Sequence, residues 1–126
     1  MKHIPTIARL LLGLIFVVFS LNFWLHFIPI PLPKEETPAA NFMFAIYVSG
    51  YLTVVKVLEL TGGLLLLSGR FVNLGLTLVG PVVVNIALYH FLLVKGGYEM
   101  PVLLGVLSLV ALAGRKDFTS ALFAAK

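Results

Sequence analysis

Two charged residues lie inside an apolar segment that is long enough to cross a membrane. The segment, residues 50–70, reads GYLTVVKVLELTGGLLLLSGR and carries Lys56 and Glu59 near its middle. A charged side chain at the bilayer centre costs about 2.5–3.5 kcal/mol on insertion scales, so it is expected to face protein or a wet cavity. Residues three apart on a helix project to the same side. The spacing therefore predicts one polar face, where an ammonium and a carboxylate could handle a proton or a polar headgroup.

Four more polar side chains fall within apolar segments. Asn22 and His26 are four residues apart near the end of the first segment, and Asn85 and His90 lie late in the third. An amide in lipid must find a hydrogen-bond partner. Two interpretations are open: a ligand-binding cluster shared with the charged pair, or hydrogen bonds between helices. The histidines lack HxxxH or ExxH spacing, so no metal site is predicted.

Small residues and a proline indicate how these segments pack. Gly62 and Gly63 follow Glu59 by about one helical turn and would let a neighbouring helix approach closely. Pro81 lies inside the third segment and cannot donate a hydrogen bond to the carbonyl of Thr77. A kink or a locally hydrated backbone is expected there.

The composition is that of an integral membrane protein. Of 126 residues, 60% are hydrophobic and only 11% are charged, whereas soluble domains are about 25% charged. This length accommodates four spans of about 20 residues and no separate soluble domain. The predicted fold is therefore an all-α, four-helix membrane bundle that forms a single transmembrane domain from residue 1 to residue 126.

Apolar runs and turn residues place the elements. The predicted spans cover residues 7–27, 42–68, 71–94 and 98–114, with an outer, proline-rich loop over residues 28–41. Residues 39–48 have two interpretations, as the start of a long tilted second span or as a separate interfacial helix. The aromatic residues near the outer ends of the spans have two interpretations, as an outer aromatic belt or as an aromatic slot of quinone size: Phe23, Trp24, Phe27, Phe42, Phe44, Tyr47 and Tyr51.

The distribution of basic residues predicts the orientation. Six of them fall on one side of the predicted spans: Lys2, Arg9, Arg70, Arg115, Lys116 and Lys126. Only Lys34 and Lys95 fall on the other side. The positive-inside rule then places both termini in the cytoplasm, with the protein in the inner (cytoplasmic) membrane. Arg9 is expected to extend its guanidinium towards the inner headgroups.

Several classes of function are excluded by what the chain lacks. It has no cysteine, which removes disulfides, thiolate metal ligands, CxxC redox chemistry and cysteine nucleophiles. It has no P-loop, GxSxG or HExxH motif. Its net charge of +4 is scattered among loops, so no nucleic-acid partner is predicted. An autonomous enzyme is not expected, and a redox role would need a bound cofactor or a partner subunit.

Two stretches carry a resemblance to a known family. The opening ARLLLGLIFVVFSLNFWLHFIPIP and the centre KVLELTGGLLLLSGRFVNLGLTLVGPVVVNIALYHFL resemble the DoxX family of small four-span bacterial membrane proteins. Asn73 departs from the pattern, which often has proline after RFV. The matching residues fall in order: Lys56, Glu59, Gly63, Arg70, Phe71, Pro81, Asn85 and His90.

The resemblance implies a fold more firmly than an activity. Family members are linked to quinone-dependent oxidoreductases, and others resemble membrane partners of redox proteins, assembly factors or cargo receptors. The first hypothesis is a quinone- or small-lipid-binding, or anchoring, non-catalytic subunit of an oxidoreductase complex, with its polar cluster centred on Lys56 and Glu59. The alternative is a non-enzymatic scaffold or assembly factor that binds a partner protein through the loop at 28–38 and the helix faces. A homo-oligomer is compatible with either.

Overall fold

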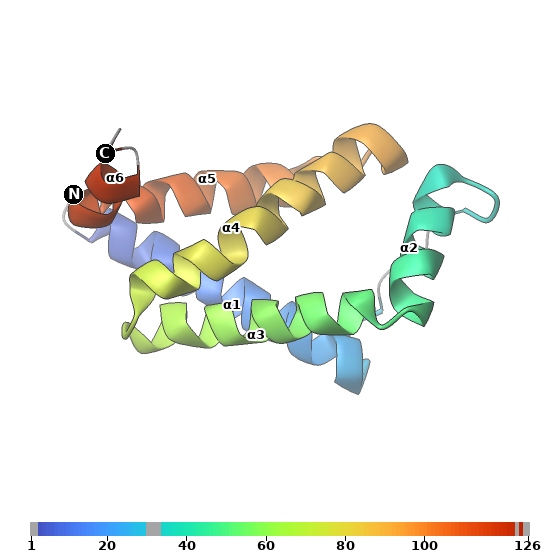
Figure 1. Ribbon diagram of the computed structural model, residues 1–126, viewed down its shortest axis with the longest axis horizontal. Helices are drawn as coiled ribbons and strands as arrows, with labels where there is room; N and C mark the ends of the chain where they lie inside the picture. The colour runs from blue at the N-terminus through green and yellow to red at the C-terminus, as the bar shows by residue number, and fades with distance from the viewer. Residues whose placement is uncertain (1–2, 30–33, 123, 125–126) are drawn as a thin grey trace.

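The computed structural model describes residues 3–29, 34–122 and 124, and every regular element in these ranges is helical. The helices are α1 (Ile4–Leu25), α2 (Pro38–Val48), α3 (Tyr51–Ser68), α4 (Val72–Leu88), the π-helical turn η1 (Tyr89–Val94), α5 (Glu99–Ala113) and α6 (Lys116–Leu122) (Figure 1). Residues 30–33 of the predicted outer loop, with Lys2 and Lys126, lie outside the described residues. The prediction of an all-α fold is thus confirmed.

In the part of the chain that the structure describes, three helices are long and apolar enough to cross a membrane. They are Ile4–Leu25, Tyr51–Ser68 and the continuous helix Val72–Val94, of 22, 18 and 23 residues. The predicted fourth span corresponds to α5, which is apolar but has only 15 residues. Fifteen residues rise about 22 Å, less than the roughly 30 Å of a bilayer core. A fourth span therefore stays a prediction.

The predicted span 42–68 is divided into two helices. The chain breaks at Ser49 and Gly50, where Gly50 has a φ of +83°. Glycine reaches this left-handed region without the steric cost that a Cβ imposes. Before the break, Thr37 begins α2 by accepting a hydrogen bond from the backbone N–H of Ala40 at 3.2 Å. Figure 1 shows α2 running across the end of α3, not in line with it.

The four longest apolar helices contact one another in a ring. Helix α1 packs on α3 and α5, and α4 packs on the same two helices. Figure 1 shows that successive members run in opposite directions, so that both chain ends and the α3–α4 turn lie at one end of the molecule. We call this the terminal end, and the opposite end, where α2 lies, the α2 end.

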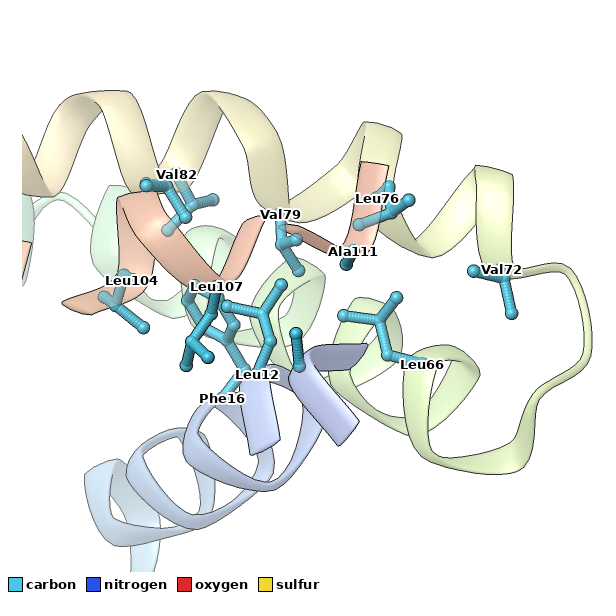
Figure 2. Close-up of a cluster of buried hydrophobic side chains, with 12 residues drawn as sticks. Leu12, Phe16, Leu66, Val72, Leu76, Val79, Val82, Leu104, Leu107 and Ala111 are labelled. Atoms are coloured by element: carbon cyan, nitrogen blue, oxygen red, sulfur yellow. The ribbon is translucent and has the colours of Figure 1, made fainter. Parts of the chain in front are cut away.

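A single apolar cluster fills the space between these helices (Figure 2). Its most buried members include Leu12, Leu66 and Val79, none of which retains exposed surface. Interdigitated side chains supply the dispersion contacts that hold helices together where no water is present. The buried members of the cluster are Ala8, Leu12, Phe16, Leu66, Val72, Leu76, Val79, Val82, Val83, Leu104, Leu107 and Ala111.

Aromatic contacts hold α2 against its neighbours. Phe23 of α1 meets Tyr47 at 6.1 Å between ring centroids, in an edge-to-face arrangement. On the other side, Phe42 meets Tyr89 of η1 at 5.8 Å. Such pairs contribute about 0.5–1.5 kcal/mol beyond the area they bury. Three of the aromatic residues predicted to lie at the outer side, Phe23, Phe42 and Tyr47, thus take part in the contacts of α2.

Candidate functional site

Lys56 and Glu59 form the ion pair that their spacing predicts. The Nζ atom of Lys56 lies 3.4 Å from Oε1 of Glu59, one turn along α3. The two side chains are unequally covered, since Lys56 keeps 20% of its side-chain surface exposed and Glu59 keeps 5%. Glu59 lies at the middle of α3, and Lys56 is about 4.5 Å nearer the α2 end. The carboxylate is therefore the buried member, and the ammonium reaches the surface.

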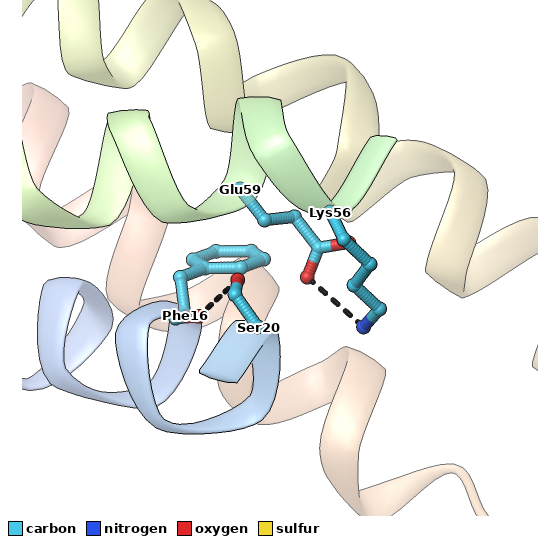
Figure 3. A network of polar contacts seen from close by, with 4 residues as sticks. All are labelled: Phe16, Ser20, Lys56 and Glu59. Carbon is cyan, nitrogen blue, oxygen red and sulfur yellow. Dashed lines mark hydrogen bonds and ion pairs between the residues drawn. The ribbon is translucent and has the colours of Figure 1, made fainter. Parts of the chain in front are cut away.

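The buried carboxylate faces α1. Figure 3 shows the pair on α3 opposite Phe16 and Ser20 of α1. Phe16 and Ser20 are both fully or almost fully buried. The Ser20 hydroxyl donates to the carbonyl of Phe16 within its own helix, which uses its one donor. The only charge partner of Glu59 among the described residues is Lys56.

Glycines bring α3 within backbone contact of two helices. A Cβ on Gly63 would lie 3.0 Å from the carbonyl oxygen of Gly13 in α1, and one on Gly62 only 2.6 Å from Val79 of α4. The contact between α3 and α4 also has a glycine on α4: a Cβ added to Gly75 would lie 3.1 Å from the backbone oxygen of Gly62. Both glycines that follow Glu59 thus lie at close helix crossings, which position the ion pair against α1.

Asn22 and His26 do not join the ion pair. The Asn22 side chain is buried and binds both backbone groups of Ile28, donating to its carbonyl at 3.0 Å and accepting from its N–H at 2.6 Å. His26 ends α1 in the left-handed conformation, with a φ of 54°, and its side chain is exposed. Asn22 and His26 are four residues apart and would share a face of a continuous helix, but α1 ends at Leu25 and His26 lies just beyond it. Asn22 therefore serves the chain reversal after α1.

Asn85 and His90 also find their partners locally. The Asn85 amide donates to the carbonyl of Pro81 at 3.0 Å, and its side chain is exposed. Nδ1 of His90 lies 3.1 Å from the carbonyl oxygen of Gly96, beyond the end of η1. Helix α4 continues through Pro81, which is itself exposed. Among the described residues, no hydrogen bond joins these four side chains to the ion pair, and a six-residue binding cluster stays a prediction.

The surroundings of the pair limit what it can bind. The two best-formed hollows on the described residues lie elsewhere, one of about 190 Å³ between α1 and α5 and one of about 370 Å³ beside α4 and α6. Neither includes Lys56 or Glu59 in its wall. Within the described ranges, no three His, Asp or Glu side chains gather as metal ligands would. A ligand of the pair would therefore approach the exposed ammonium from the side of the helix.

Sequence reasoning missed two polar contacts at the terminal end. Arg9 donates from Nη1 to the carbonyl of Leu66, so it caps the last turn of α3 and is not directed to lipid headgroups alone. Arg115 donates from Nε to Oδ1 of Asn73 at 2.9 Å, joining the start of α4 to the end of α5. Arg9 was visible as a charge inside an apolar span, but its partner is a backbone carbonyl, which no sequence pattern marks.

Comparisons with protein-family models, with curated proteins and with solved structures found no match to this chain. The resemblance to the DoxX family therefore stays a hypothesis that rests on the sequence.

Proposed function

We propose that this chain is a DoxX-like multi-pass protein of the cytoplasmic membrane. In this proposal it is a four-helix bundle that serves a membrane redox complex as a non-catalytic subunit and binds a quinone or another small lipid at Lys56. Three helices of membrane length support the membrane placement. The gathering of Arg9, Arg70, Arg115 and Lys116 at the terminal end supports cytoplasmic termini.

One observation carries the ligand proposal: the ammonium of Lys56 is only partly satisfied. It has three N–H donors and a single partner among the described residues, the Glu59 oxygen at 3.4 Å. It is also partly exposed, on a helix whose exposed surface carries no other charged side chain. A charged donor at this depth requires further acceptors. The carbonyl oxygens of a quinone, or the ester and headgroup oxygens of a small lipid, are acceptors that can reach it through the bilayer.

The two members of the ion pair would contribute differently to the binding of such a ligand. Glu59 is held against α1 and orients the ammonium of Lys56. Lys56 then donates to the ligand oxygen from the exposed side. Removing either charge would weaken binding, and Lys56→Met also leaves the buried Glu59 carboxylate without its ion-pair partner, so the fold of this variant is verified before its ligand content is compared.

The test is native mass spectrometry of gently solubilised protein, with solvent extraction to identify bound isoprenoid quinones or lipids. We expect a stoichiometric ligand in the wild-type chain and its loss in Lys56→Met, which keeps the length and apolar stem of the side chain. Lys95→Met is the matched control, since it removes an exposed lysine at the α2 end. Retention of the ligand by a well-folded Lys56→Met protein would contradict the proposal.

A second candidate, a non-enzymatic scaffold or assembly factor, is favoured by a different observation. Helix α2 presents large apolar side chains that the described chain leaves mostly uncovered, with Phe44 70% and Tyr47 62% exposed. Here the ion pair only fixes the contact between α1 and α3, and the partner protein binds at the α2 end.

The scaffold function predicts a different sensitivity to mutation. Replacing Phe44 by Ser should release a co-purifying membrane partner, whereas Lys56→Met should leave that partner bound. Partner loss in Lys56→Met with no effect of Phe44→Ser would instead favour the ligand-binding subunit.

A further inference from the structure

A polar groove lies at the terminal end, away from the ion pair. It encloses about 370 Å³ beside the start of α4 and the junction between α5 and α6. Its wall combines cationic, amide and apolar side chains: Asn73, Ala113, Gly114, Arg115, Lys116, Asp117 and Phe118. The other hollow described above is lined by apolar residues only, so of these two hollows the polar groove is the one with groups that can recognise a charged ligand.

Arg115 is held in a fixed orientation within this groove. Its Nε donates to Oδ1 of Asn73 at 2.9 Å, across 42 residues of sequence. This bond leaves both terminal nitrogens of the guanidinium, which carry four N–H donors, without a hydrogen-bond partner among the described residues. An oriented guanidinium loses less side-chain freedom when it binds an oxyanion and can engage two of its oxygens at once.

The charges around the groove favour an anion. Arg115 and Lys116 line it with Asp117 as the single carboxylate, so its own side chains sum to +1 (two cations minus one anion). Arg70, exposed in the turn three residues before Asn73, adds a further positive charge nearby. Asp117 disfavours a highly charged anion and favours one that carries a single negative charge.

The position of the groove along the helices indicates the depth in the membrane at which it would bind an anion. Asn73 is the second residue of α4 and Ala113 is the last of α5. A helix that spans the hydrocarbon core has its ends at the level of the headgroups. Phosphodiester groups of anionic phospholipids lie at this level, and basic sites at the cytoplasmic ends of helices bind them. Phe118 and Ala113 supply apolar wall beside the charged groups.

We infer that this groove binds the phosphate of an anionic phospholipid headgroup, with Arg115 and Lys116 as its donors and Asn73 as the residue that positions Arg115. The inference rests on the proposed placement of α4 and α5 across a membrane, but not on the ligand of Lys56.

The test measures phospholipid binding to the full chain in mild detergent by native mass spectrometry, with phosphatidylglycerol and phosphatidylcholine added separately. We expect phosphatidylglycerol to bind the wild type at least about tenfold more tightly than phosphatidylcholine. The double variant Arg115→Gln/Lys116→Gln should lose about tenfold or more, since it removes both cationic donors to the phosphate. Asn73→Ala, which changes no charge, should lose a few-fold.

The matched control is Lys34→Gln/Lys95→Gln, which removes two exposed positive charges at the α2 end. Equal loss in this control, or unchanged binding in the groove variant, would overturn the inference. Displacement of the lipid by an equal concentration of inorganic phosphate would overturn the assignment to a headgroup. Lys56→Met protein that still binds phosphatidylglycerol would separate this site from the proposed function.

Discussion

Arg9 illustrates how a single charged residue is accommodated inside an apolar helix. Its guanidinium donates to the carbonyl of Leu66, in the last turn of α3, and lies against Gly69 at the end of that helix. The last four carbonyls of a helix have no partner within it, and together they carry a partial negative charge. Arg9 donates a hydrogen bond to one of these carbonyls, that of Leu66. The guanidinium and the carbonyl therefore each supply the polar partner that the other needs among apolar side chains.

Replacing Arg9 by methionine should therefore destabilise the protein. The variant keeps an apolar stem of similar length but leaves the Leu66 carbonyl without its side-chain donor. Hydrogen bonds to charged groups contribute about 1.5–3 kcal/mol, and we expect a loss in the lower part of that range. Unfolding in detergent, followed by the fluorescence of Trp24, measures it.

Arg70→Met is the control for this variant. Arg70 is an exposed arginine in the turn at the same end, and no side-chain hydrogen bond from it is found among the described residues. Its replacement should change the unfolding free energy by less than about 0.5 kcal/mol. Similar losses in the two variants would show that net charge, and not the contact with α3, sets the effect.

At the scale of helices, glycine positions decide how closely the elements pack. Gly63 lies against the backbone of α1, where an added Cβ would be 2.9 Å from Val17 Cγ2 and 3.0 Å from the Gly13 oxygen. A backbone atom cannot move aside without moving its helix. Gly105 of α5 differs, because a Cβ there would meet nothing within 4 Å.

Gly63→Ala and Gly105→Ala should therefore shift stability in opposite directions. At Gly63 we expect a net loss of about 1–2 kcal/mol, since forced overpacking costs more than the helix propensity that alanine adds. At Gly105 we expect a gain of up to about 1 kcal/mol, because only the propensity changes. Thermal unfolding of both variants in the same detergent tests this, and a stabilised Gly63→Ala protein would contradict the close contact of α1 and α3.

For the whole molecule, the ring of α1, α3, α4 and α5 brings the termini and the α3–α4 turn to one end. The basic residues Arg70, Arg115 and Lys116 are exposed there, and Lys34 and Lys95 lie towards the other end. The positive-inside rule then gives the proposed orientation, with the terminal end in the cytoplasm and α2 outside.

Cysteine labelling can test this orientation, and the chain contributes no background because it has no natural cysteine. In intact spheroplasts, a membrane-impermeant maleimide should label Glu35→Cys and Glu99→Cys, at the α2 end. Ser120→Cys in α6 should react only after lysis. None of these changes alters a basic residue, so the orientation signal is preserved. The opposite labelling pattern would reverse the proposed topology.

The sequence by itself determined the helical class and the pairing of Lys56 with Glu59. Both depend on local properties: a long apolar run can satisfy its backbone in lipid only as a helix, and residues three apart meet on any helix. The sequence also marked Gly62 and Gly63 as positions where another helix could approach, although not which one.

Only the tertiary structure decided the partners of the other polar residues. Asn22, His90 and Arg9 bind backbone carbonyls, which every residue possesses and which become available only where a helix ends or a turn reverses. Likewise Gly50 separates α2 from α3 because of the conformation that its backbone adopts. Local spacing predicts which side chains share a face, but the helix ends and crossings determine which groups remain in need of a partner.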